Sequence, residues 1–259
     1  MENNIKNAAE AVRRMDEHLR NDIMKDKEGW GNTAQLDKRR QGGVFTLSDH
    51  IRGMVLAMLS SNRPWEPIEE NMGKIDKIFF DYDAKKIMAE SPDNLVANIT
   101  NIKCGNKRIK FQMEALKGNI EKLIKFETES GSIDEYYKKL NKNDISFITL
   151  VKLLSGNKET KLNELGEALV CEYLRHLGYD LPKPDRHILR IFGNKMLACS
   201  EKEEAGIWEV FDIIAKIAKE IGKSSAEVDY ILWSYCTKIC TIKKDPKCSE
   251  CVAKEFCKK

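Results

Sequence analysis

Five of the eight cysteines of this 259-residue chain lie within its last 24 residues. Cys240, Cys248, Cys251 and Cys257 contain one C-x2-C pair between two longer arms, and Cys236 lies about one helical turn before Cys240. Four thiolates this close in sequence can converge on one soft metal centre. Zinc ribbons usually pair two short chelates, so the single chelate and irregular arms favour a larger [4Fe–4S] cluster. We therefore predict that these four cysteines, Cys240, Cys248, Cys251 and Cys257, ligate a [4Fe–4S] cluster, with a zinc site and a metal-free tail as the alternatives.

The overall composition fits a soluble globular protein, with 42% hydrophobic and 33% charged residues. The longest purely apolar run, residues 54–59, is far shorter than the roughly 18 residues that a membrane-spanning helix needs. The N-terminal segment is charged throughout and has no apolar stretch typical of a signal peptide. We expect a cytoplasmic location, where thiols stay reduced and clustered cysteines are not disulfides. The isolated Cys104, Cys171 and Cys199 are expected to be core residues.

A second group of candidate functional residues lies between positions 162 and 190. The stretch LNELGEALVCEYLRHLGYDLPKPDRHILR resembles the helix–hairpin–helix and aspartate region of the endonuclease III superfamily of DNA glycosylases. A chain end with C-x2-C-x5-C is a second hallmark of that family. FTLSDHIRGMVLAMLSSN at 45–62 and CGNKR at 104–108 resemble its early helix and its glycine-and-basic turn. The resemblance covers roughly residues 45–257 and implies excision of bases from DNA.

The resemblance gives roles to Leu165, Gly166 and Asp185. A hairpin with glycine in its turn presents backbone N–H groups that can bind a DNA phosphate whatever the sequence, and Leu165 and Gly166 would lie there. Asp185 would stay ionised at the start of the next helix, stabilise the positive sugar and direct a water molecule. Each has a structural alternative: close packing of Gly166 inside one helix over 159–177, and simple helix capping by Asp185.

A glycosylase must also take its target nucleotide out of the base stack, at a cost of a few kcal/mol. Asn62 resembles the wedge residue that fills the resulting gap, and Arg63 next to it would contact a phosphate. The alternative is that these residues are an ordinary helix C-terminus.

The chain departs from the family pattern at two positions of the hairpin. Glu164 stands where the family usually has glycine, and a carboxylate facing a phosphate would repel it. Ala168 stands where bifunctional members carry the lysine that forms a Schiff base, so the resemblance implies a monofunctional glycosylase that uses water. Two alternatives remain: a hairpin at 154–158 with Lys161 as the nucleophile of a bifunctional glycosylase/lyase, or a non-catalytic DNA-binding iron–sulfur protein.

The elements that must position these residues are helices. Thr46, Ser132 and Ser224 each precede an apolar segment with the spacing of an N-cap or capping box. Three glycines are predicted to end helices in the left-handed conformation: Gly178, Gly193 and Gly222. No stretch keeps two-residue alternation for long, so we predict an all-α fold.

This pattern predicts two helical lobes, a helical barrel with the hairpin over 46–178 and a second lobe made of 1–45 and 179–259 with the cluster. Basic runs at 103–125 and 238–259 would line a DNA-binding cleft. The expected partner is double-stranded DNA with a damaged or mismatched base, bound by a monomer. Alkylated purines, oxidised bases and deaminated pyrimidines all remain open as the target.

Overall fold

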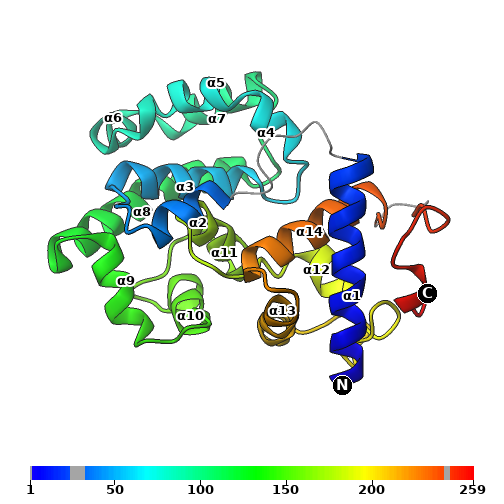
Figure 1. The fold of residues 1–259 in the computed structure, drawn as a ribbon. Helices are drawn as coiled ribbons and strands as arrows, with labels where there is room; N and C mark the ends of the chain where they lie inside the picture. The colour runs from blue at the N-terminus through cyan, green and yellow to red at the C-terminus, as the bar shows by residue number, and fades with distance from the viewer. Residues whose placement is uncertain (1, 24–32, 242–245) are drawn as a thin grey trace. The chain divides into compact units, whose positions relative to one another are not determined.

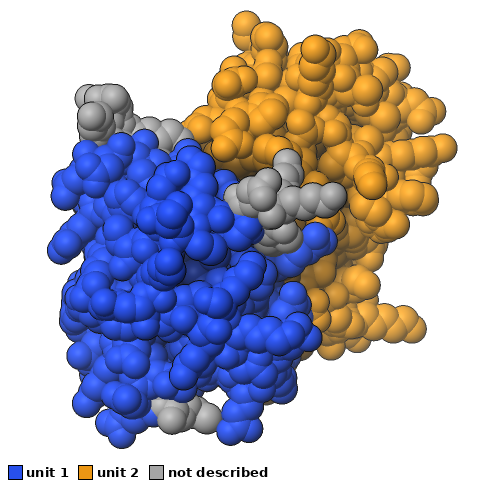
Figure 2. All heavy atoms as spheres, turned by 90° about the vertical axis from the view of Figure 1, so that its right-hand side faces the viewer, with its two compact units in different colours: residues 1–37, 178–259 blue, residues 38–177 orange. Residues whose placement is uncertain are grey.

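The computed structural model describes residues 2–23, 33–241 and 246–259. These residues form helices and no strand, which confirms the all-α prediction (Figure 1). None of the described helices is both long enough and apolar enough to cross a membrane. The chain divides into two compact units, unit 1 with residues 1–37 and 178–259, and unit 2 with residues 38–177 (Figure 2).

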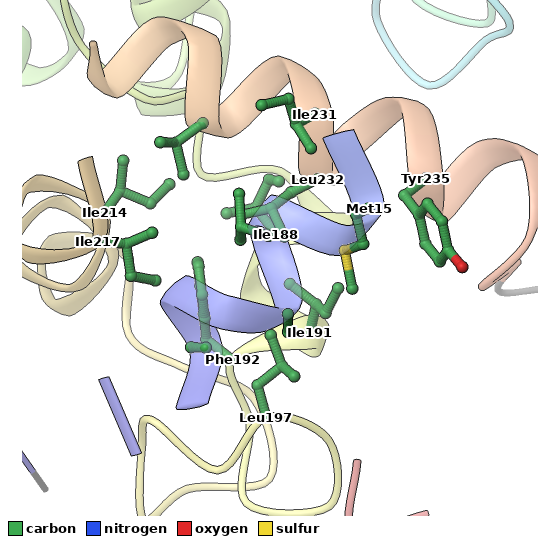
Figure 3. Packing of buried hydrophobic residues seen from close by; sticks show 14 of the residues in the cluster. Met15, Ile188, Ile191, Phe192, Leu197, Ile214, Ile217, Ile231, Leu232 and Tyr235 are labelled. Carbon is green, nitrogen blue, oxygen red and sulfur yellow. The ribbon is translucent and has the colours of Figure 1, made fainter. Parts of the chain in front are cut away.

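Unit 1 is built around one core of buried aliphatic and aromatic side chains. Its helical elements are α1 (Glu2–His18), the short π-helix η1 (Leu19–Ile23), α12 (Arg186–Ile191), α13 (Ile207–Ile221), α14 (Ser225–Lys238) and the short 3-10 helix η3 (Lys254–Phe256). Helix α1 packs against α13 and α14, and α12 packs against the same two helices. Figure 3 shows Ile188 and Ile191 of α12 among core residues from the other helices. The core therefore fixes α12, which begins directly after Asp185.

Unit 2 carries the hairpin. Helix α2 (Thr33–Arg40) crosses from unit 1 into unit 2, whose remaining elements are α3 (Leu47–Leu59), α4 (Glu66–Glu70), α5 (Met72–Ile78), the 3-10 helix η2 (Phe80–Tyr82), α6 (Ala84–Ala89), α7 (Pro92–Asn101), α8 (Ile109–Ser130), α9 (Ile133–Asn141), α10 (Ile148–Gly156) and α11 (Glu167–His176). Helix α3 is buried along most of its length and packs against α8 and α11. The end of α3 and the start of α11 are thus supported by the same scaffold.

The predicted helix starts are confirmed by their caps. The Thr46 hydroxyl accepts a hydrogen bond from the Asp49 N–H at 3.2 Å, and the Asp49 carboxylate accepts one from the Thr46 N–H at 2.8 Å. Ser224 forms a second reciprocal box of this kind, and Ser132 caps α9 through its side chain. These local hydrogen bonds satisfy donors that would otherwise have no partner at the helix ends.

The predicted left-handed conformation is confirmed at two of the three glycines and is wrong at Gly193, although α12 does end just before it, at Ile191. Gly178 and Gly222 adopt left-handed φ angles of 75° and 68°. Gly193 does not, and a Cβ at this position would collide with the carbonyl oxygen of Glu203. Glycine is needed at 193 because another segment passes close to the backbone, a requirement that the local sequence does not reveal.

The three isolated cysteines, Cys104, Cys171 and Cys199, are buried, as predicted.

Candidate active site

The hairpin lies between two separate helices. Helix α10 ends at Gly156 and α11 begins at Glu167. The loop between them folds back on α10, because the Leu162 N–H donates to the Leu154 carbonyl at 2.8 Å and the Thr160 hydroxyl donates to the Leu153 carbonyl at 2.8 Å. The alternative of one long helix over 159–177 is therefore wrong.

Gly166 is the N-cap residue of α11, with φ −76° and ψ 178°. It is exposed, and a Cβ built there would meet nothing within 4 Å. Close packing therefore does not explain why residue 166 is a glycine. Helix α11 also begins without a side-chain cap, so its first-turn N–H groups are open to an anion.

Leu165 differs from the expectation for a DNA-contacting residue. Its side chain is only 1% exposed and belongs to the core of unit 2. Leucine is an apolar residue that anchors the loop, so only its backbone is left to face a ligand.

Glu164 has a left-handed backbone, the conformation that favours glycine. Its φ is 63°, in the left-handed region that non-glycine residues rarely adopt. The carboxylate is held by the guanidinium of Arg108, whose Nη2 lies 2.8 Å from Oε1 and 2.7 Å from Oε2 and whose Nε lies 3.0 Å from Oε2. The negative charge that would repel a phosphate is thus paired.

Helix α8 fastens the remainder of the loop. The buried Asn119 side chain accepts a hydrogen bond from the Asn163 N–H at 2.7 Å and donates to the Asn163 carbonyl at 2.9 Å. Lys122 Nζ donates to the Lys161 carbonyl at 2.5 Å. Sequence reasoning missed Asn119, because an asparagine inside a helix carries no motif.

Two residues of the predicted basic surface therefore have a structural role. Arg108 and Lys122 belong to the basic run at 103–125, yet both hold the hairpin loop in place. Part of the second run, residues 242–245, lies outside the described residues.

Asp185 is the N-cap residue of α12. Its Oδ1 accepts hydrogen bonds from the His187 N–H at 2.8 Å and the Ile188 N–H at 3.2 Å. The other oxygen, Oδ2, has no hydrogen-bond partner among the described residues. The carboxylate is half-buried, so capping uses one oxygen and leaves the other for a different partner.

The segment before Asp185 is anchored from α14. The Lys183 N–H donates to Asp229 Oδ1 at 2.9 Å, and Asp229 is 1% exposed. The Asp185 N–H donates in turn to the Lys183 carbonyl at 2.7 Å. The backbone that carries the candidate catalytic carboxylate is therefore tied to the core of unit 1 on both sides.

His187 stands beside Asp185 in the first turn of α12. Its Nδ1 is buried and has no hydrogen-bond partner among the described residues. Burial lowers the pKa of His187 below its ordinary value, so the neutral ring is favoured at pH 7. This environment fits a packing role better than that of a cationic phosphate contact.

Ala168 is the second residue of α11, which matches the register expected from Gly166. The alternative register required a turn at 154–158, but residues up to Gly156 belong to α10. Lys161 lies in the loop and not in the second helix, and its N–H donates to the Asn157 carbonyl at 2.8 Å. The observed helix boundaries therefore favour the register with Ala168.

Asn62 follows the end of α3 as an exposed residue with φ 52°. The Arg63 side chain does not lie where a phosphate contact would require it. Its Nη1 donates to the Gly105 carbonyl at 2.5 Å and its Nη2 to the Lys103 carbonyl at 2.6 Å. Asn62 and the hairpin belong to unit 2, whereas Asp185 belongs to unit 1.

The four cysteines of the predicted cluster, Cys240, Cys248, Cys251 and Cys257, line one cavity of unit 1. Three lysines, Lys247, Lys254 and Lys259, line it as well and would favour an anionic centre. Among the described residues, no three Cys, His, Asp or Glu side chains form a group that could hold one metal ion. The cavity is thus lined by four cysteines that could ligate a cluster, but among the described residues their side chains are not arranged around a single metal ion. The cluster stays a prediction.

Cys236 and Cys240 have different positions at this cavity. Cys240 lines it, whereas Cys236 is fully buried and is not part of its wall. A hydrogen bond from the Cys236 thiol lowers the pKa of Cys240 to about 6, and Arg190 Nη2 lies 3.5 Å from the Cys240 sulfur. The thiolate, which is the ligating form, is therefore favoured at Cys240.

Comparisons with known proteins show a shared fold. No family model and no curated protein matches the sequence. The structure is similar to that of Methanocaldococcus jannaschii 8-oxoguanine glycosylase/lyase in complex with 15mer DNA containing 8-oxoguanine, with a TM-score of 0.59, 15% identity, and coverage of 90% of this chain and 99% of that one. It is also similar to Methanocaldococcus jannaschii 8-oxoguanine DNA glycosylase, with a TM-score of 0.54, 16% identity, and coverage of 88% of this chain and 93% of that one. Over nearly its whole length, the chain therefore has the helical fold of these DNA glycosylases.

Proposed function

We propose that this protein is a DNA glycosylase that hydrolyses the N-glycosidic bond of a damaged or mismatched base. One observation carries the proposal. On a fold similar to that of DNA glycosylases, Asp185 has one oxygen fixed by the N–H groups of α12 and the other without a hydrogen-bond partner among the described residues. A half-buried carboxylate held in this way suits stabilisation of positive charge on a sugar.

In the proposed reaction, the His187 and Ile188 N–H groups at the start of α12 hold Oδ1 of Asp185 in place. As the base leaves, Oδ2 would face the developing positive sugar and orient a water molecule for attack. Fixing the carboxylate beforehand avoids reorganisation during the reaction. Ala168 has no amine to form an imine, so the proposed enzyme releases the base without cutting the backbone.

The hairpin would bind the DNA backbone. The uncapped start of α11 offers N–H groups to a phosphate, and the exposed Gly166 leaves room for its approach. The Arg108–Glu164 pair supports this role because it removes most of the repulsion that an unpaired carboxylate would exert. Binding of this kind is independent of sequence, as a search for damaged bases requires.

We also propose that Cys240, Cys248, Cys251 and Cys257 hold a [4Fe–4S] cluster. In a cubane each thiolate binds a different iron atom, so the four sulfurs surround a cavity and need not meet at one point. Cys236, buried behind Cys240, would act as a hydrogen-bond donor. The group would supply a structural tie for the tail and no step of base release.

The target base is proposed from the comparison alone. One similar structure contains DNA with 8-oxoguanine, which makes an oxidised purine the first substrate to test. A bifunctional glycosylase/lyase is the second candidate, because both similar proteins are 8-oxoguanine glycosylases and one is described as a glycosylase/lyase. Lys161 in the hairpin loop is its candidate nucleophile.

The test is a panel of duplexes, each with one oxidised, alkylated or deaminated base, assayed for base release. A monofunctional enzyme gives strand breaks only after alkali, whereas a bifunctional one gives them without alkali. Binding of the duplexes without release of any base would refute the proposed activity and support the non-catalytic alternative.

A further inference from the structure

The tip of α3 is connected to a second loop by a network of side chains. Asn62 is exposed at the tip, and the residues around it are held by the segment 103–112 of the same unit. All of these contacts are within unit 2. They bear on the proposed function because Asn62 is the candidate wedge.

Arg63 is the central contact. Its two terminal nitrogens donate to two carbonyls of one turn, those of Lys103 and Gly105, at 2.6 and 2.5 Å. Its Nε is buried and has no hydrogen-bond partner among the described residues. A guanidinium that bridges two backbone carbonyls of the protein is not directed at a phosphate.

A second pair of side chains closes the end of α3. Asn106 donates to the Met58 carbonyl at 2.9 Å and to the Gln112 side chain at 3.1 Å. Gln112 is 1% exposed and donates to the same Met58 carbonyl at 3.1 Å. The Met58 carbonyl also accepts a hydrogen bond from the Ser61 N–H at 3.2 Å, so the two amides add to the contacts that hold the end of α3.

The backbone of the tip is left-handed. Asn62 has a φ of 52°, a conformation that asparagine adopts more readily than other non-glycine residues. Arg63 makes its contacts directly after Asn62, and Asn106 contacts the carbonyls of Met58 and Leu59 in the last turn before it, so the chain is fixed on both sides of the tip.

From this arrangement we infer that Arg63 is a positioning residue that holds Asn62 in the geometry needed to fill the gap left by an extruded base, and that it does not contact a phosphate. The inference rests on the proposed function. In a wedge held in advance, the ordering of the tip is complete before DNA binds, so less free energy is lost on extrusion.

Two readouts separate positioning from phosphate contact. The probe is a duplex with 8-oxoguanine opposite cytosine and 2-aminopurine next to the lesion, and all variants carry Asp185→Asn so that the base is not released. The fluorescence of 2-aminopurine in the saturated complex reports extrusion, and the dependence of the affinity on salt reports phosphate contacts.

Arg63→Met should lower the extruded fraction about tenfold, the effect of losing hydrogen bonds from a charged donor, without changing the salt dependence. If Arg63 instead contacts a phosphate, the slope of log K against log[salt] should become shallower by about 0.9. Lys107→Met is the matched control, because Lys107 is an exposed cation of the same turn without a side-chain hydrogen bond or ion pair to the described part of the chain. Arg63→Lys keeps the charge but cannot span both carbonyls, so positioning predicts reduced extrusion and phosphate contact predicts little change.

A double variant tests whether Arg63 acts through Asn62. Asn62→Ala should itself reduce extrusion, and adding Arg63→Met should then cause little further loss. Additive losses, or normal extrusion in Arg63→Met and Arg63→Lys, would overturn the inference. Thermal melting identifies unfolded variants, and Arg63→Lys is the milder change if Arg63→Met is unstable. Failure of the protein with intact Arg63 to extrude any base would count against the proposed function as well.

Discussion

Replacing Glu164 by glycine should stabilise the hairpin and tighten DNA binding together. Glu164 has a φ of 63°, and the left-handed conformation costs an ordinary residue about 1 kcal/mol that glycine does not lose. The replacement also removes the ion pair with Arg108, whose side chain is 54% exposed. Exposed pairs are worth about 0.2–1 kcal/mol, so the net effect on the free energy of unfolding is expected to be between zero and about 1 kcal/mol of stabilisation.

The effect on DNA binding follows from charge. The Arg108–Glu164 pair carries no net charge, so removing the carboxylate leaves one unpaired cation there. Two unit charges about 7 Å apart in water interact by about 0.6 kcal/mol, so the affinity for a phosphate at that distance should improve by roughly threefold. Arg108 would also be released and could pair with a phosphate, which would steepen the salt dependence by about 0.9 in slope. Binding is measured by fluorescence anisotropy on an undamaged duplex over a range of salt concentrations.

Glu164→Ala is the matched control, because it removes the charge and keeps the unfavourable backbone. It should show the same gain in affinity as Glu164→Gly, but it should be less stable by about 1 kcal/mol in urea unfolding. Equal stability of the two variants would refute the backbone part of the reasoning. Weaker DNA binding by both variants would refute the position of Glu164 near a phosphate.

Three further predictions concern the chemistry. Asp185→Asn should keep DNA affinity but lower the rate of base release by about two orders of magnitude, measured in single-turnover assays, because charge aimed at the transition state is commonly worth about 3 kcal/mol; full activity would leave Asp185 as a helix cap only. Borohydride should trap no covalent complex with abasic DNA, since Ala168 has no amine, and trapping that is lost in Lys161→Ala would identify the bifunctional alternative. Purified protein should be brown and contain iron and sulfide, and Cys240→Ser should lose the visible absorbance while Cys236→Ser keeps most of it; colourless protein with one zinc would disprove the cluster.

The helix starts could be predicted from the sequence because their determinants are local. The reciprocal hydrogen bonds of Thr46 with Asp49 and of Ser224 with Glu227 join residues three positions apart, so the pattern of residue types is sufficient. The start of α11 at Glu167 agrees with the hairpin glycine, Gly166, that the family resemblance indicated. The prediction failed at Gly193, where the constraint comes from a carbonyl ten residues away in a separate turn.

The supports of the candidate site could not be predicted, because they join distant parts of the chain. Asn119 holds Asn163 across 44 positions and Arg108 holds Glu164 across 56. A charged residue type shows that a cation is present but not which acceptor it binds. Arg63 illustrates this limit, since a backbone carbonyl and a phosphate both attract a guanidinium.

Glu164 also bears on the choice between an enzyme and a non-catalytic binding protein. In the sequence, Glu164 and Ala168 together resemble loss of an active site. In the structure, Glu164 has a left-handed backbone and its charge is paired by Arg108, so the carboxylate is accommodated in an ordered loop. Only Ala168 then removes a chemical group, and that group serves imine formation but not hydrolysis by water. Since Asp185 retains an oxygen without a hydrogen-bond partner among the described residues, the two departures are compatible with the monofunctional enzyme that we propose.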